Sequence, residues 1–384
     1  YNAPRVRANI QSAFQGCNSS TFLYKQATLV RAAVWKPNAI LSPVITRTYY
    51  VDSAATNRFH LPIVSVVMPD DQLFDYDTGI YVPGEYYDQT CATANPQGNF
   101  DRDEERASHF ELFTQEGQLL YRQNGGARIH GNYSTNWPRK SFRYEARGRY
   151  ENGQFEYPLF PGLSAYPEAG GGLIEEYNAF IIRNSGNNCD NNLFRDAMMH
   201  RLVNHLHTDG QHSRAVVHFV NGEYWGIMNL REKHDEFYFA SHYNMNDEDV
   251  IIANARTASI SSGYPYEYQH YSNLENYVNA NSLAVQANYD YVNTQMDIEN
   301  YCVHFMIEIY LNNTDFLGNN RKFWRKRTPS YIPGAPFGQD GRWRWILYDL
   351  DQGFANPSYD RLTPTTTGTD ISTRILRKLL DNTE

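Results

Sequence analysis

The chain has no excess of positive charge, no long apolar run and no repeat, and each absence excludes a class of protein. It carries 34 Lys and Arg against 43 Asp and Glu, a net charge of −9. This balance argues against nucleic-acid binding, which needs concentrated basic residues. The longest apolar run, around Leu61 to Met68, is far shorter than the roughly 20 residues that cross a bilayer. No internal repeat of 20–50 residues is visible, so we expect no solenoid, no nucleic-acid partner and no membrane span.

Cysteine is also scarce, and the four cysteines follow no metal-binding pattern. Cys17, Cys91, Cys189 and Cys302 show no C-x-x-C spacing, so a zinc knuckle is not expected. Cys302 falls at helical spacing with apolar neighbours, which is typical of a buried small hydrophobe. Cys17 and Cys91 lie in Asn-, Ser- and Thr-rich segments, where a disulfide is compatible with a site outside the cell. Three pairings are possible, and the sequence does not select one.

The length predicts a large core, and the aromatic content is compatible with a secreted protein. A chain of 384 residues can form two lobes or a domain with an extension. Thirty tyrosines and 15% aromatic residues suit a bacterial surface protein. Because the chain starts at Tyr1 without Met and stops at Glu384 within an apparent helix, we interpret it as part of a longer protein whose signal peptide has been removed.

Polar residues near the C-terminal end form a pattern that suits a divalent metal and a phosphate. Asp315 and Asn320 stand in the loop YLNNTDFLGNN after a predicted helix over 297–311, and Asp349 and Asp351 end the strand-like stretch RWRWILYDLD. Magnesium prefers carboxylate, amide, water and phosphate oxygens. Protein kinases use the same order, a D-x-x-x-x-N loop followed by a metal-binding Asp. We predict Asp315 as the base and Asn320 and Asp349 as metal ligands.

Asp351 is predicted as a second metal carboxylate, because side chains alternate between the faces of an extended strand. One face would then carry Trp343, Trp345, Leu347, Asp349 and Asp351. The alternative is that the Asn- and Gly-rich stretches are ordinary turns and that Asp349 only caps a strand.

The N-terminal part contains strand-like stretches with turn signals between them. In residues 1–57, TLVRAAVWKP and SPVITRTYYV are joined by a Pro/Asn turn, and they resemble the last strands of a chitobiase-like β-sandwich module. From Phe59, LPIVSVVMP predicts a buried strand. Turns at Glu116-Gly117 and Asn221-Gly222 predict two hairpins, and the second hairpin leads through a strand into a helix.

Three further segments carry weaker signals. DRDEER at 101–106 fits no calcium motif and is predicted as a solvated charged turn. A helix over 189–207 is predicted to begin at Asp190 or Asn188. Its histidines match no zinc template, and we expect surface histidines at a helix end; they are His200, His205, His207 and His212. Residues 255–295 carry little signal and are compatible with a substrate-facing insertion.

Several separated motifs together resemble the CotH family, the spore-coat-type secreted kinases. They are LPIVSVV…LFDYDTGIYVPG, RIHGNYSTNWPRKSFRYEAR, FIIRNSGNNCDNNLFRDAMMHRL, VNGEYWGIMNLREKHDEFY, NNTDFLGNNRKFW and WILYDLDQGF. The resemblance covers roughly residues 59–384 and keeps the family's motif order.

The resemblance implies an α+β, atypical protein-kinase-like two-lobed fold, with a β-rich N-lobe, a helical C-lobe and a short N-terminal β extension. The domains would be 1–57 for the extension, 58–235 for the N-lobe and hinge, and 236–384 for the C-lobe. The implied ligands are ATP and Mg²⁺ or Mn²⁺. The residues implied to hold the nucleotide are Arg128, Gly131, Asn132, Arg139, Lys140, Met228 and Glu232. Lys140 would neutralise phosphates, but its acidic partner is not identifiable, although Asp196 lies on the predicted helix.

The sequence departs from ordinary kinases at three places. Asn313-Thr314-Asp315 replaces His-Arg-Asp, Asp349-Leu350-Asp351 replaces Asp-Phe-Gly, and no Ala-Pro-Glu motif follows. We therefore expect a secreted or cell-surface bacterial phosphotransferase that acts on Ser/Thr of extracellular or coat proteins without activation-loop control. The alternatives are a structural or adhesive surface protein with little catalysis, and a relative that transfers AMP or an amino acid.

Overall fold

The structure, a computed structural model, describes residues 26–38, 42–51, 59–85, 87, 98–189 and 191–382. Cys17, Cys91 and Asp190, which entered the predictions above, lie outside these residues. The chain divides into two compact units, each built from three stretches of sequence. The first contains 1–157, 176–193 and 213–232, and the second contains 158–175, 194–212 and 233–384. The fold is mixed α+β, as predicted.

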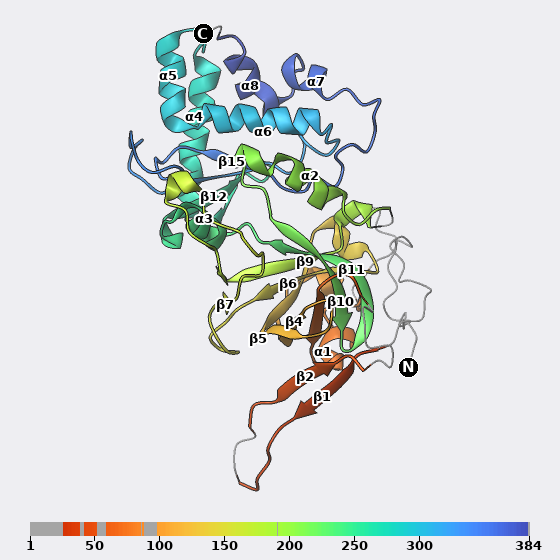
Figure 1. Cartoon of the computed structure of the whole chain (residues 1–384). Coiled ribbons are helices and arrows are strands. Elements are labelled where there is room, and N and C mark those ends of the chain that lie inside the picture. Colours follow the sequence, from red (N-terminus) through yellow and green to blue (C-terminus); the bar gives the residue numbers. More distant parts are fainter. Residues whose placement is uncertain are drawn as a thin grey trace. The chain divides into compact units, whose positions relative to one another are not determined.

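A closed barrel forms the first unit (Figure 1). Its strands are β3 (Ile63–Val67), β4 (Arg106–Phe113), β5 (Leu119–His130), β6 (Ser141–Glu145), β9 (Ala179–Arg183), β10 (Ser213–Val220) and β11 (Glu223–Glu232). The order is β10-β11-β9-β6-β5-β4-β3, and the barrel closes by a parallel pairing of β10 with β3. The other pairings are antiparallel.

The sequence accounts for the barrel strands and their turns. All five residues of β3 are buried, which confirms the apolar run as a core strand. Both predicted hairpins are confirmed, β4 with β5 and β10 with β11. The second turn places Asn221 at φ 50° and Gly222 at φ 78°, the left-handed pair that matches strand twist in a two-residue hairpin. Aromatic rings fill the interior, for example Phe110 and Phe180, whose centroids lie 4.8 Å apart.

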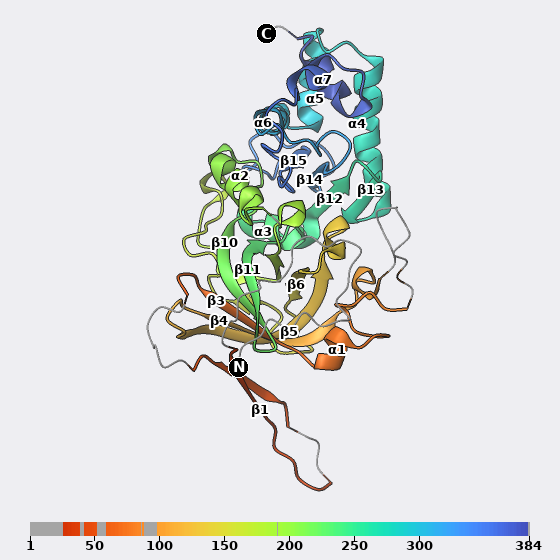
Figure 2. The same ribbon diagram turned by 90° about the vertical axis from the view of Figure 1, so that its right-hand side faces the viewer.

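The N-terminal strands form a separate two-stranded sheet, β1 (Thr28–Ala32) with β2 (Ile45–Tyr49), which Figure 2 shows beyond the barrel strands. This confirms the two strands predicted in residues 1–57. The sheet is joined to the barrel, because Thr48 Oγ1 lies 2.9 Å from Ser65 Oγ and Tyr50 packs edge-on against Phe113 and Phe219. Its origin as part of a β-sandwich stays a prediction. The remaining elements here are α1 (Asp70–Phe74), η2 (Asn99–Asp101), η3 (Tyr133–Asn136), β7 (Phe155–Glu156), β8 (Glu176–Tyr177) and η5 (Gly186–Asn188).

The second unit combines a four-stranded sheet of order β13-β12-β14-β15 with helices. The strands are β12 (Val250–Asn254), β13 (Ser259–Ser262), β14 (Lys322–Lys326) and β15 (Arg344–Ile346). The α-helices are α2 (Arg195–Val203), α3 (Glu236–Tyr243), α4 (Tyr268–Ala280), α5 (Gln286–Gln295), α6 (Ile298–Tyr310), α7 (Leu362–Thr366) and α8 (Arg374–Leu379). Short 3₁₀ turns are η4 (Pro167–Ala169), η6 (Asn204–Leu206), η7 (Asp247–Asp249), η8 (Pro265–Glu267) and η9 (Ile371–Thr373). Within the described ranges, no helix has the length and apolar character needed to cross a bilayer.

Helix α6 is fixed at its start and along its buried face. The Asp297 carboxylate caps it by accepting the N–H of Asn300 at 3.1 Å. Arg344, 1% exposed, binds the same Asp297 carboxylate at 2.9 Å and both oxygens of Asp340. The Asn300 side chain also accepts the N–H of Trp345 at 2.7 Å. Helix α6 and strand β15 are therefore tied together before the loop that follows the helix.

Two local predictions are wrong. The helix predicted over 189–207 is shorter, and its N-cap is Phe194 without a side-chain cap, in place of Asn188. His200 is not a surface histidine: it is 2% exposed, because it faces inward from α2. Residues 255–295 contain β13, α4 and α5, and their role as a substrate-facing insertion stays a prediction. Cys189 forms a disulfide, and Cys302 keeps a free thiol.

Candidate functional site

The loop after α6 brings Asp315 and Asn320 into direct contact. Asn320 Nδ2 donates to Asp315 Oδ2 at 3.0 Å, and Asn319 Nδ2 donates to Asp315 Oδ1 at 2.9 Å. The N–H of Asp315 donates to Asn313 Oδ1 at 3.2 Å. Both carboxylate oxygens of Asp315 are thus oriented by amides from its own loop.

The same contact defines which atom of Asn320 is available to a cation. Because Nδ2 is directed at Asp315, the amide oxygen is the atom that can ligate a metal. Asn320 adopts φ 55°, a left-handed conformation that asparagine tolerates better than most residues. The loop geometry therefore depends on asparagine at this position.

Asp349 does not lie in a strand, which corrects the alternation argument. Strand β15 ends at Ile346, and Asp349 adopts φ 60°. A left-handed residue interrupts the extended backbone, so Trp343, Trp345 and Leu347 do not predict where Asp349 and Asp351 point. All three of these apolar residues are buried, as is Asp351, which is 2% exposed, whereas Asp349 is half-buried.

Asp315 and Asp349 act electrostatically on the same neighbours. Both carboxylates raise the pKa of Glu308 and of Tyr348, although burial is the larger cause in each case. Electrostatic effects of this kind are appreciable only over short distances in a protein. Asp315, bonded to Asn320, and Asp349 thus share electrostatic neighbours, and we call these three residues the acidic loop site.

Glu308 of α6 is a buried acid beside this site that the sequence reasoning missed. It is fully buried, and within the described chain neither carboxyl oxygen has a hydrogen-bond partner of standard geometry. Burial raises its pKa to about 8, and Asn313 and Arg361 oppose this rise. At neutral pH the carboxyl is therefore protonated. One signal was available: Glu308 lies at i+4 from His304 on an otherwise apolar helix face.

Lys322, the first residue of β14, is the second residue that the sequence reasoning missed. Its ammonium group lies 5.0 Å from the centre of the Tyr348 ring. Burial lowers the pKa of Lys322, and the Asp349 carboxylate opposes that effect. A cation near Asp349 is thus part of the electrostatics of the acidic loop site.

In the first unit, Lys140 precedes β6 by one residue and points into the protein. It is 1% exposed, and its Nζ donates to the carbonyl oxygens of Thr135 at 2.6 Å and Trp137 at 3.0 Å. The ammonium group also lies 4.0 Å from the centre of the Phe100 ring. Burial lowers the pKa of Lys140 to about 7, and the nearby Asp101 carboxylate opposes this. Asp101 is therefore the acid associated with Lys140, and the sequence analysis did not find it.

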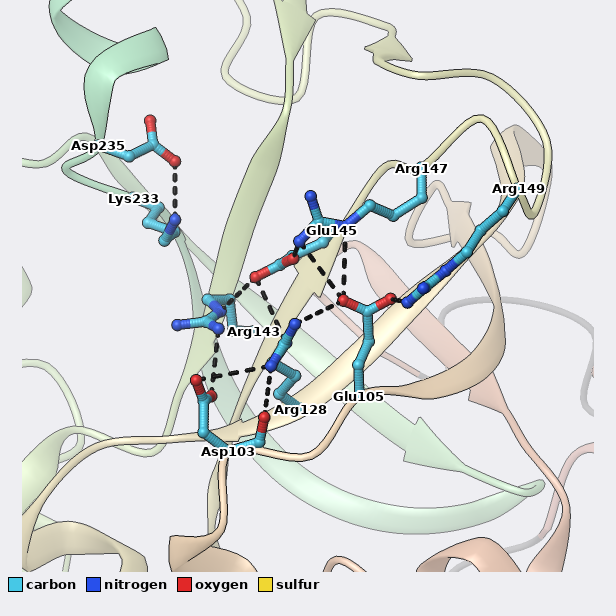
Figure 3. Close-up of polar contacts among 9 residues, drawn as sticks. All are labelled: Asp103, Glu105, Arg128, Arg143, Glu145, Arg147, Arg149, Lys233 and Asp235. Carbon is cyan, nitrogen blue, oxygen red and sulfur yellow. Dashed lines mark hydrogen bonds and ion pairs between the residues drawn. The ribbon is translucent and has the colours of Figure 1, made fainter. Parts of the chain in front are cut away.

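Arg128 takes part in an ion-pair network that joins β5 and β6 to the segment before β4 and the segment after β6 (Figure 3). Its guanidinium binds Glu105 at 2.9 Å and lies 3.6 Å from Glu145. The other members are Asp103, Arg143, Arg147 and Arg149. A hollow of about 390 Å³ is lined by five residues of this surface, namely Glu105, Arg128, Arg147, Gly148 and Arg149. Its walls carry paired charges in place of the apolar lining typical of small-molecule pockets.

The other predicted nucleotide residues also belong to the first unit. Gly131 begins the loop that Lys140 holds, and it adopts φ 131°. A Cβ atom at this position would clash with Ser134 Oγ, so only glycine fits. Asn132 precedes η3. Arg139 Nη1 donates to the carbonyl oxygen of Ile227 at 3.5 Å. The last two residues, Met228 and Glu232, are buried in β11.

Among the described residues, no three His, Cys, Asp or Glu side chains are grouped so as to hold a metal ion. The acidic loop site offers two carboxylates and an amide oxygen, a set of hard oxygen donors that suits Mg²⁺ or Mn²⁺ when phosphate and water supply the other ligands. The residues present therefore fit a nucleotide-bound cation better than a metal held by protein alone.

Comparison with known proteins gives one family. A family model described as CotH kinase protein matches residues 127–384. This range contains the acidic loop site and most of the barrel. No curated protein matches the chain.

Proposed function

Because the chain belongs to the CotH kinase protein family, we propose that it is a metal- and ATP-dependent phosphotransferase with a two-lobed, kinase-like arrangement. The proposed acceptors are Ser and Thr hydroxyls of extracellular or coat proteins. The observation that carries the proposal is the side-chain bond between Asp315 and Asn320, with Asp349 in the same electrostatic neighbourhood.

The roles follow from the contacts of each residue. Asp315, oriented by two amides, accepts the proton of the acceptor hydroxyl. Asn320, through its amide oxygen, and Asp349 bind Mg²⁺ or Mn²⁺, with Asp351 as a further candidate. The cation, when bound, neutralises charge on the nucleotide phosphates. Lys322, beside Asp349, adds positive charge to the same place.

The nucleotide residues of the first unit are part of the proposal. The backbone amides around Gly131 and Asn132 are proposed to contact phosphates, and Arg139 assists. Lys140 is proposed to hold this loop in place, because its Nζ donates to the carbonyl oxygens of Thr135 and Trp137. The strand from Met228 to Glu232 is proposed to flank adenine. Arg128 is better suited to holding the barrel surface, because Glu105 and Glu145 already bind its guanidinium.

Secretion is the second element of the proposal. The disulfide at Cys189 supports it, because disulfides persist in oxidising compartments and are rare in the cytosol. Thiol labelling of protein taken directly from intact cells, with and without prior reduction, tests this. Equal labelling in both samples would contradict a secreted, disulfide-bonded protein.

The proposal is tested by comparing Asp315→Asn with Asp349→Asn. We expect D349N to lose metal-dependent ATP affinity, because the neutral amide no longer holds the cation. We expect D315N to keep ATP affinity while the rate falls about 100-fold or more, the usual contribution of a positioned acid–base group. Calorimetry with ATP and Mg²⁺ or Mn²⁺, beside transfer from γ-labelled ATP, measures both. The opposite pattern would reverse the two roles.

A structural or adhesive surface protein is the second candidate. It is favoured by the burial of Asp351, a proposed metal ligand that is only 2% exposed. Incubation with α-labelled and γ-labelled ATP separates the candidates. Transfer of γ-label supports the kinase, transfer of α-label indicates AMP transfer, and lack of ATP binding favours the structural protein.

A further inference from the structure

We propose that Asp196 and Arg195, in the first turn of α2, are positioning residues that hold the segment Asp349-Leu350-Asp351 in the conformation that binds the cation. The proposal rests on the proposed function of Asp349. It assigns to α2 a role that neither the motif spacing nor the family match provides.

Two polar contacts join the start of α2 to this segment. The N–H of Leu350 donates to Asp196 Oδ1 at 2.7 Å, and Arg195 Nη1 donates to the carbonyl oxygen of Asp351 at 3.4 Å. The Leu350 N–H belongs to the peptide group that follows Asp349. The Asp196 carboxylate therefore fixes the orientation of the peptide on the C-terminal side of the metal-binding residue.

Asp349 needs such a contact because its own conformation is unfavourable. Its φ of 60° lies in the left-handed region, which costs free energy for a residue with a Cβ atom. Residues in this region keep their conformation only when the surrounding structure imposes it. A hydrogen bond from a backbone N–H to an ionised acceptor is among the stronger restraints available.

An acid in the first turn of α2 is favoured by the helix dipole, but this does not explain why Asp196 is buried. Asp196 is 2% exposed, and a buried carboxylate is costly unless it is bonded. The same helix face packs into a cluster of buried apolar residues that includes Leu350, namely Met199, Val203, Ile307, Leu311, Leu347 and Leu350. An apolar residue would suit this cluster, so the carboxylate is there for its bonds.

His200 completes the arrangement on the other side of Asp196. Its Nδ1 accepts the N–H of Gln211 at 3.2 Å, and its Nε2 lies 3.7 Å from Asp196 Oδ1. The bond at Nδ1 leaves the proton of a neutral imidazole on Nε2, directed at Asp196. The Leu350 N–H is thus hydrogen-bonded to Asp196 Oδ1, and the His200 ring packs beside the same oxygen.

The test compares Asp196→Leu, which removes the acceptor, with Asp196→Asn, whose amide oxygen can still accept the Leu350 N–H. Hydrogen exchange at the Leu350 amide in the metal-free chain and Mn²⁺ binding with ATP, measured by calorimetry, are the two readouts. We expect D196L to speed exchange at Leu350 at least about 10-fold and to weaken Mn²⁺ binding by a similar factor. We expect D196N to stay within about 3-fold of wild type in both.

Two further variants keep the test decisive. Asp370→Leu removes an exposed acid that accepts the N–H of Ser372 at 2.7 Å, and it controls for the loss of an ordinary side-chain cap. If D196L does not fold, Arg195→Met takes its place, with faster exchange at Asp349-Leu350-Asp351 and weaker Mn²⁺ binding expected. The inference is overturned if the Leu350 amide exchanges at the wild-type rate in D196L, or in R195M when D196L is unfolded. It is also overturned if the same variant binds Mn²⁺ as the wild type does while Asp349→Asn abolishes Mn²⁺ binding. If Asp349→Asn itself leaves Mn²⁺ binding unchanged, the proposed function fails instead.

Discussion

Replacing Glu308 by Gln should remove the pH dependence that this one buried carboxyl gives to the free energy of unfolding. Glu308 is fully buried on α6, and its pKa is raised from 4.5 to about 8, mainly by burial. Gln has nearly the same shape and cannot ionise. The variant therefore isolates the effect of the proton from the effect of packing.

The sign follows from which state releases the proton first. Between pH 4.5 and about 8 the unfolded chain has lost the Glu308 proton, whereas the folded chain still holds it. The free energy of unfolding of the wild type should therefore fall as pH rises through this range, and the effect should be complete above it. The fall is limited to roughly 4 to 5 kcal/mol, at about 1.4 kcal/mol for each tenfold difference in proton affinity. E308Q should lack this fall.

Urea denaturation of both chains from pH 4 to 9, in the presence of a chelator, measures the difference. Near pH 4 we expect the free energy of unfolding of the wild type to equal or exceed that of E308Q. At pH 9 we expect the free energy of unfolding of E308Q to be larger by a few kcal/mol. Glu299→Gln on the exposed side of the same helix is the control and should leave the profile unchanged. A constant difference between wild type and E308Q across the range would refute a raised pKa at Glu308.

Three other variants test the elements that support the site. Arg344→Met leaves two acids without their buried partner and should lower the free energy of unfolding by about 3–5 kcal/mol in denaturant titrations, with a smaller loss for Arg342→Met. Gly131→Ala combines φ 131° with a steric clash and should cost about 1–3 kcal/mol in thermal melts, whereas Gly148→Ala, with open space around it, should be nearly neutral. Burial lowers the pKa of Lys140 from 10.5 to about 7 in the folded chain. Between these two pH values the unfolded chain keeps the proton and the folded chain has lost it, so the stability of the wild type should rise with pH. Lys140→Met should abolish that rise in thermal melts from pH 6 to 10.

Sequence reasoning identified the features that depend on neighbouring residues. The Asn221-Gly222 hairpin follows from turn chemistry alone, and the buried strand β3 follows from an uninterrupted apolar run. The pairing of Asp315 with Asn320 is similarly local, since five residues of one loop bring the two side chains together.

The features that were missed depend on distant residues. The left-handed conformation of Asp349 is held by contacts with α2, about 150 positions earlier. Lys140 was expected to face phosphates, but in the structure its Nζ is bonded to carbonyl oxygens of its own loop. The burial of Glu308 and His200 depends on how complete helices pack, and residue spacing carries no information about this.

The parallel pairing that closes the barrel has a consequence for how the chain folds as it is synthesised. Strand β3 pairs with β10 through contacts such as Ile63 with Val217, so the barrel cannot close until β10 has left the ribosome. Until then β3 presents an open, apolar edge, the kind of edge that promotes pairing with other chains. Pairing over such a long sequence separation is also intrinsically slow. We therefore expect fragments that end after β9 to aggregate. We expect production of the whole chain to improve at lower temperature, because the association of apolar surfaces weakens on cooling.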